Sequence, residues 1–294
     1  MKKIKYVLAL FVGLIMVMSA SANNCGKYRI DGNLSDWGLN LNQDWSENST
    51  WLPNPGVYFQ VEDNHNPRHA NDSTIVGSTT PSGVHIQGVG GSYSFYDEKP
   101  VYHRDGYKVS EPYGSPDEKY DIEAIYFDQD TKCIYVAVVM GLKPDGEGDS
   151  APGDLALDID GDGNYEYGVK LGTKTGLVQF AIYKDIIWAP PKYIPENAPT
   201  VILSGTENGT ATGAYTSSYV PQDNGYNNYV VELAIPKSSI GNPQTPVSIY
   251  DLHLSESCSN EHIPTPEFPI AISIALLLAS PAFAYLIIKK RRKE

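Results

Sequence analysis

Residues 121–127 read DIEAIYF and residues 133–141 read CIYVAVVMG, and these two apolar runs, separated by the polar DQDTK, decide the fold class. Short runs of β-branched and aromatic residues bounded by turn residues are typical of buried strands. Seven further runs of this kind follow at 154–160, 164–171, 176–182, 200–204, 214–220, 228–235 and 247–254. No long helical pattern interrupts them. The sequence therefore predicts an all-β protein built as a β-sandwich.

The two ends of the chain carry targeting patterns. Lys2 and Lys3 precede an apolar run over 6–18, and Ala20-Ser21-Ala22 has the small residues that a signal peptidase recognises. We expect residues 1–22 to be a signal peptide; a retained anchor helix is less favoured because the apolar run is short. Residues 268–288 carry no charge and precede a basic cluster at 289–293, which predicts a transmembrane helix with a cytoplasmic tail.

Between these ends, residues 23–263 are expected to form one exported ectodomain, with a long loop-rich insertion over 64–118. The chain has 22 basic and 35 acidic residues, and eight of the basic but only two of the acidic residues, Glu267 and Glu294, lie outside 23–263. The ectodomain is therefore strongly acidic. This charge argues against a nucleic-acid partner.

The three cysteines, Cys25, Cys133 and Cys258, lack the close spacing of a metal site. An exported chain favours disulfides. We expect one disulfide between Cys25 and Cys258, because the ends of a domain often lie close together. Export also makes glycosylation plausible at the four Asn-x-Ser/Thr sites, Asn33, Asn48, Asn71 and Asn208.

Residues 158–166 read DIDGDGNYE and form the best candidate for a metal site. A turn over 161–163 would place Asp160 opposite Asn164 and Asp158 opposite Glu166. Alternating carboxylates of this kind bind Ca²⁺, so the predicted ligands are Asp158, Asp160, Asp162, Asn164 and Glu166. An EF-hand would need an acid where this loop has Val169, and it would need flanking helices. A solvated acidic hairpin without metal therefore remains the alternative.

Two tryptophans are candidates for ligand binding. Trp45 and Trp51 lie in a polar setting rich in Asn and Pro, where exposed indoles could stack on sugar rings. Trp37, after the first strand-like segment, is expected to be a core residue. The chain has no nucleophile elbow, phosphate-binding glycine loop or helical H-E-x-x-H motif, and we expect no enzyme activity.

Pro266-Glu267-Phe268, the apolar segment and the basic tail resemble, in this order, the PEF-type C-terminal sorting signal of archaeal surface proteins. The resemblance covers about the last thirty residues, 264–294. It implies processing by an archaeosortase-like sorting protease, after which a lipid would replace the helix as the membrane anchor.

A second resemblance concerns the ectodomain. Residues 28–38, YRIDGNLSDWG, and residues 231–241, VELAIPKSSIG, are similar to the opening and late strands of family-9-type carbohydrate-binding modules and DOMON-type domains. That resemblance implies a jelly-roll-like sandwich, but such sandwiches serve several functions.

These observations predict a non-enzymatic cell-surface or cell-envelope protein with a structural or adhesive role, stabilised by Ca²⁺ and anchored at its C-terminus. The alternative is a surface module that binds glycans through its aromatic residues.

Overall fold

The computed structural model describes residues 25–41, 51–63, 84–95, 122–190, 192, 198–217, 228–243 and 251–255. The predicted signal peptide, the transmembrane segment and the Pro266-Glu267-Phe268 motif lie outside these residues. Within them, no helix has the length and apolar character needed to cross a membrane.

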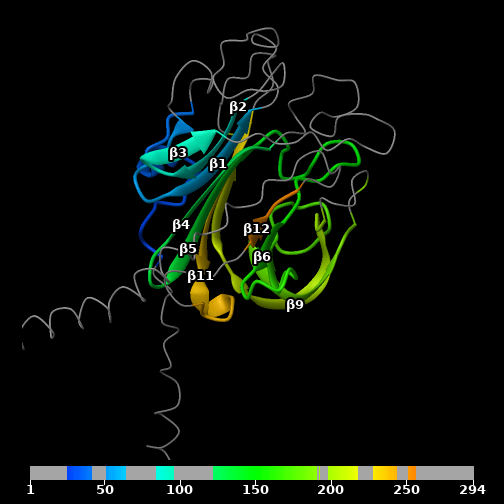
Figure 1. Ribbon diagram of the computed structural model, residues 1–294. Coiled ribbons are helices and arrows are strands. Elements are labelled where there is room, and N and C mark those ends of the chain that lie inside the picture. The colour runs from blue at the N-terminus through cyan, green and yellow to red at the C-terminus, as the bar shows by residue number, and fades with distance from the viewer. Residues whose placement is uncertain are drawn as a thin grey trace, which may run out of the picture.

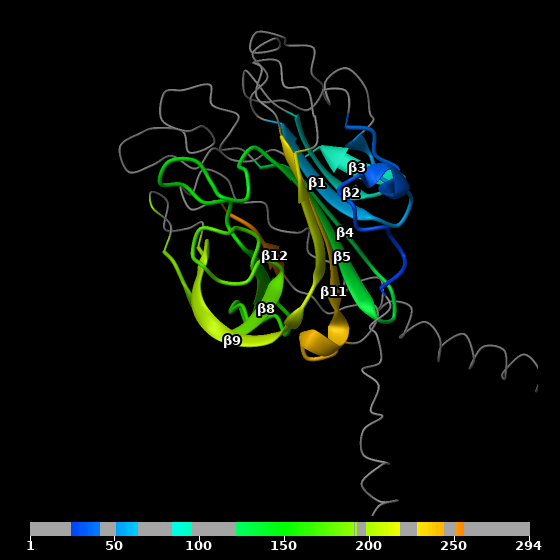
Figure 2. The same ribbon diagram turned by 180° about the vertical axis from the view of Figure 1, so that it is seen from behind.

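The strands form two antiparallel sheets that face each other (Figures 1 and 2). In spatial order, the larger sheet consists of β10 (Thr212–Thr216), β11 (Tyr229–Pro236), β5 (Cys133–Met140), β4 (Ile122–Gln129), β1 (Tyr58–Asp63), β2 (Val84–Val89) and β3 (Ser92–Phe95). The smaller sheet consists of β12 (Asp251–His253), β6 (Leu155–Asp158), β7 (Tyr167–Val169), β8 (Ala181–Trp188) and β9 (Ile202–Thr210). The predicted all-β class is confirmed.

Strand β5 is buried along its whole length because the larger sheet is covered on both faces. Its residues alternate between two cores. Ile134 and Val136 belong to the cluster that packs against the smaller sheet, whereas Tyr135 and Ala137 belong to a cluster on the opposite face. This double coverage explains why the run at 133–141 is apolar throughout rather than alternating.

The second cluster is covered by the N-terminal segment, residues 25–41, which lies on the face of the larger sheet away from the smaller one (Figure 2). The short 3₁₀ helix η1 (Leu34–Trp37) begins at Asn33, whose side chain accepts a hydrogen bond from the Ser35 N–H. Trp37 is fully buried and stacks on Tyr28 with ring centroids 4.1 Å apart, so its expected core role is confirmed.

Most predicted strands have a counterpart, but two regions differ. In the predicted run at 176–182, strand β8 begins only at Ala181. The residues before it form a turn that starts at Thr173, in which Gly176 has a φ of 76°. The expected loop-rich insertion over 64–118 contains β2 and β3, which extend the larger sheet beyond β1. β2 (VHIQGV) and β3 (SYSF) are short and are flanked by Gly and Ser residues, and this setting hid them in the sequence.

Candidate functional site

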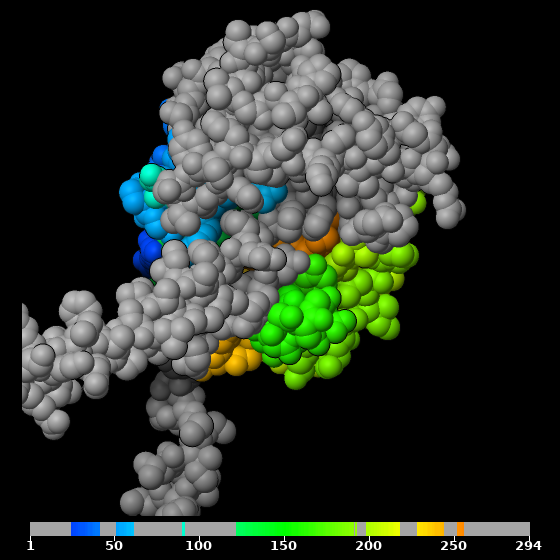
Figure 3. Space-filling view, viewed as in Figure 1, coloured from blue at the N-terminus to red at the C-terminus, as the bar shows by residue number. Residues whose placement is uncertain are grey.

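The acidic hairpin joins β6 to β7, and the strands at its base pair in the predicted register. Leu157 pairs with Tyr167, the ladder ends at this pair, and the residues after Asp158 form the turn. Gly161 and Gly163 both have a positive φ, near 80°, which glycine adopts without strain at a turn. The turn therefore lies where the sequence places it. Figure 3 shows green surface beside the orange of β12 uncovered on the viewed face.

Four carboxylates converge at this hairpin. Asp158, Asp160, Asp162 and Glu166 each offer an oxygen, and these oxygens all lie within 4.8 Å of one another. Asp158 is buried, Asp160 and Asp162 are exposed, and Glu166 is half-buried. Asn164, the fifth predicted ligand, donates its amide N–H to Asp162 Oδ1 at 3.0 Å. The structure thus brings together the residues that the sequence selects.

Backbone hydrogen bonds hold the carboxylates in place. Asp158 Oδ1 accepts from the N–H of Gly161 at 2.7 Å, and its Oδ2 accepts from the N–H of Gly163 at 3.0 Å. Asp160 accepts from the Asp162 N–H at 3.1 Å, and Glu166 accepts from the Ile159 N–H at 2.8 Å. A carboxylate has about four lone-pair sites, so each one can also bind a cation.

Like charges at this tip oppose one another. Burial, together with the nearby Asp160 and Asp158, raises the pKa of Glu166 even though backbone N–H groups bond to it. The hydrogen bonds from Asn164 lower the pKa of Asp162. On the other side of β6, the register with β12 pairs Asp251 with Asp158. A hard, oxygen-preferring cation would relieve this repulsion, and the all-oxygen donor set fits Ca²⁺.

The chain matches no protein-family model, no curated protein and no solved structure. What the hairpin can do therefore follows from its own chemistry. The donor set offers charge and coordination. It contains no nucleophile paired with a base.

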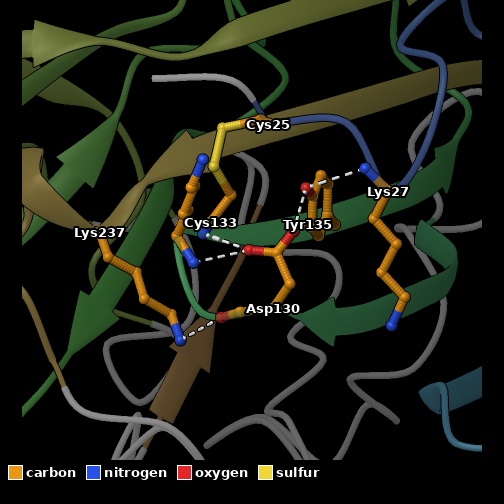
Figure 4. The surroundings of a disulfide bond; sticks show 7 residues. Cys25, Lys27, Asp130, Cys133, Tyr135 and Lys237 are labelled. Carbon is orange, nitrogen blue, oxygen red and sulfur yellow. Dashed lines mark hydrogen bonds between the residues drawn. A yellow bond between two sulfur atoms is a disulfide. The ribbon is translucent and has the colours of Figure 1, made fainter. Parts of the chain in front are cut away.

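The disulfide joins Cys25 to Cys133, so the predicted pairing of Cys25 with Cys258 is wrong (Figure 4). Their Cα atoms lie 5.7 Å apart across a sequence separation of 108 residues. The N-terminal segment runs along the larger sheet and meets β5 at the first residue of that strand. Cys258 lies outside the described residues.

Asp130 organises the turn beside this disulfide (Figure 4). Its carboxylate accepts hydrogen bonds from the N–H groups of Lys132 and Cys133, at 2.7 and 2.8 Å, and from the Tyr135 hydroxyl at 2.7 Å. The buried ammonium of Lys237 donates to the Asp130 carbonyl at 2.6 Å. Partial burial favours the neutral acid, but the three hydrogen bonds outweigh it and lower the pKa of Asp130.

This lowered pKa predicts how stability depends on pH. A carboxyl whose pKa is lower in the folded state stabilises the fold above its unfolded-state pKa, near 4, and loses that contribution as the pH falls through the folded-state pKa. Asp130→Ala is expected to reduce the free energy of unfolding by about 1–3 kcal/mol at pH 7. The difference from the wild type should shrink toward pH 2–3, as measured by urea unfolding across pH. An equal loss at both ends of this range would contradict the assignment.

A single carboxylate ties the N-terminal segment to the larger sheet. Glu232, fully buried in β11, accepts from the Trp37 indole N–H at 2.9 Å and from the N–H groups of Asp31 and Gly32, also at 2.9 Å. Burial raises the pKa of Glu232 although these donors lower it. The two sequence phrases at 28–38 and 231–241 thus meet in space at this residue.

The other predicted positions have mixed outcomes. Trp51 is 3% exposed and packs in the second cluster, on the face of the larger sheet away from the smaller one, so its predicted role as an exposed stacking platform is wrong. Its backbone carbonyl accepts a hydrogen bond from buried Tyr126. Asn33 is exposed, whereas the half-buried Asn208 uses its amide to bond the Ser239 carbonyl at 2.9 Å. Trp45, Asn48 and Asn71 lie outside the described residues.

Proposed function

We propose that this chain is a non-enzymatic cell-surface protein with a structural or adhesive role, whose jelly-roll-like sandwich is stiffened by Ca²⁺ at the hairpin tip. The observation that carries this proposal is the convergence of four carboxylates within 4.8 Å on a pre-ordered turn. Asp158, Asp160, Asp162 and Glu166 would hold the ion through oxygen atoms, with Asn164 beside them. The ion would replace mutual repulsion by coordination, because the carboxylates already face one another.

The terminal segments complete the proposal. Residues 1–22 direct export, and 268–288 or a replacement lipid anchors the protein after the sorting motif meets an archaeosortase-like protease. The disulfide between Cys25 and Cys133 suits an oxidising exterior. In this arrangement the sandwich lies outside the membrane and the basic tail lies inside before any processing.

Thermal unfolding tests the metal site. The purified protein is melted in EDTA and then in millimolar CaCl₂, because a ligand that binds only the folded state raises its stability. At a calcium concentration of about 100 times Kd, we expect the midpoint to rise by about 5–10 °C for a domain of this size. Asp160→Ala should abolish the rise.

Asp149→Ala is the matched control, since Asp149 is an exposed acid outside the hairpin. It should retain the full rise in midpoint. An unchanged midpoint in the wild type would reduce the hairpin to a solvated acidic turn. Replacing Ca²⁺ by Mg²⁺ should give a smaller rise, because Mg²⁺ demands tighter octahedral geometry and dehydrates reluctantly.

The glycan-binding alternative has less support among the described residues. Of the two tryptophans that it relies on, Trp51 is buried and Trp45 lies outside that part of the chain. We therefore keep the structural role as the first proposal.

A further inference from the structure

A lysine and an aspartate face each other in the interior at the end of the hairpin opposite the acidic tip. Asp154 immediately precedes β6 and Lys170 immediately follows β7. Their side chains are 0% and 1% exposed. Lys170 Nζ lies 2.8 Å from Asp154 Oδ2 and 3.1 Å from Oδ1, so the amine faces both oxygens of the carboxyl group.

The backbones that carry these two side chains are fixed. The Lys170 N–H donates to the Ala181 carbonyl at 3.0 Å, and the Lys170 carbonyl accepts from the Phe180 N–H at 2.7 Å. The Asp154 N–H donates to the Thr200 carbonyl at 2.8 Å. Groups held in this way react as if at very high concentration, because the entropy of bringing them together has already been lost.

Backbone donors surround the carboxyl group. Oδ1 accepts from the N–H groups of Leu171 at 2.7 Å and Gly172 at 3.3 Å, and Oδ2 accepts from the Ile202 N–H at 2.7 Å. Two N–H groups aimed at one oxygen form the arrangement that stabilises the oxyanion of a tetrahedral intermediate in acyl transfer.

Burial also works against the ionic form of the pair. Removing an ammonium and a carboxylate from water costs several kcal/mol for each ion, and mutual attraction repays this only in part. Burial raises the pKa of Asp154, although Lys170 and the backbone donors act in the opposite direction. Proton transfer from Nζ to Oδ2 along the 2.8 Å contact would give an uncharged amine and an uncharged acid.

We propose that Lys170 and Asp154 condense into an intramolecular isopeptide bond. The Nζ lone pair attacks Asp154 Cγ, and the negative charge develops on Oδ1 between the Leu171 and Gly172 N–H groups. The bond from Cγ to Oδ2 then breaks, and Oδ2 leaves as water with two of the three ammonium protons. The step is balanced without any other reactant: an ammonium and a carboxylate become one secondary amide and one water.

The product would close the β6–β7 hairpin covalently at its base. The acidic turn lies at its other end, so the hairpin would be fixed at both ends, by a covalent bond and by coordination. This inference does not depend on the metal site, because the Lys170–Asp154 pair shares no residue with the predicted metal ligands.

Peptide mass mapping of the full-length protein, purified, reduced and denatured, tests the bond. Trypsin cannot cut after an acylated Lys170 and cuts poorly between Lys143 and Pro144, so we expect a peptide 133–174 that lacks the mass of one water. Chymotrypsin should then cut after Tyr165 or Tyr167 and leave two fragments joined. In Lys170→Arg, trypsin should cut after position 170 and give a linear peptide 133–170 without loss of water. In Lys174→Arg the bond should be retained.

Two outcomes would overturn the proposal. The first is a predominant linear peptide 133–170 of full mass in the wild type. The second is loss of water with normal cleavage after Lys170, which would indicate a succinimide at a site such as Asp162-Gly163. Both are read from the wild-type protein, so the test does not depend on the folding of a variant.

Discussion

Replacing Glu232 by alanine is expected to lower the free energy of unfolding by about 3–4 kcal/mol, because three N–H donors lose their acceptor at once. The Trp37 indole and the Gly32 N–H are buried, so water cannot easily replace the carboxylate. Urea unfolding measures the loss. Tryptophan fluorescence should show a native-state change, since Trp37 would no longer be held against β11.

Two variants sharpen this prediction. Glu207→Ala removes the same side chain from an exposed position on β9, and it should change stability by less than about 0.5 kcal/mol. Glu232→Gln keeps one oxygen acceptor and should lose less than Glu232→Ala. If Glu232→Ala were no worse than Glu207→Ala, the carboxylate would not hold the N-terminal segment.

Removing the disulfide by Cys25→Ala with Cys133→Ala is expected to cost about 4 kcal/mol. The bond closes a loop of 108 residues, and a loop of that length restricts the unfolded chain strongly in the chain-entropy model. Unfolding under non-reducing conditions measures the difference. In a strong reductant the wild type and the double variant should unfold at similar urea concentrations, since neither then has the bond.

Cys258→Ala discriminates between the two pairings. If Cys25 bonds with Cys133, this variant keeps the disulfide, and its stability should match that of the wild type. If Cys25 bonded with Cys258, as sequence position suggested, Cys258→Ala would be as damaging as the double variant. Non-reducing peptide mapping gives an independent answer.

The parts of the structure that the sequence predicts are local ones. The register of the acidic hairpin follows from a turn of Gly161 and Gly163 between two short strands, and all the deciding residues lie within about ten positions. The strands β4, β5 and β11 can also be predicted from their continuous apolar runs, because their residues are buried on both faces.

The parts that the sequence does not predict depend on distant contacts. The partner of Cys25 is decided by where the N-terminal segment crosses β5, which no spacing of cysteines reveals. Trp51 lies in a polar stretch of the sequence, yet it is buried in the second cluster, under the N-terminal segment. The bond between Glu232 and Trp37 spans 195 positions, although an acid inside an apolar strand is a signal that could have pointed to a buried acceptor.

Strand β12 acquires a mechanical meaning if the C-terminal tail is the anchor. This strand has three residues, lies at the edge of its sheet and pairs only with β6 among the described strands. Tension between the envelope and the body of the protein would enter the fold through β12 and reach β6 first. If Ca²⁺ binds at Asp158, at the end of β6, the ion would lie on the strand that bears the force. Calcium would then set the force at which β12 detaches.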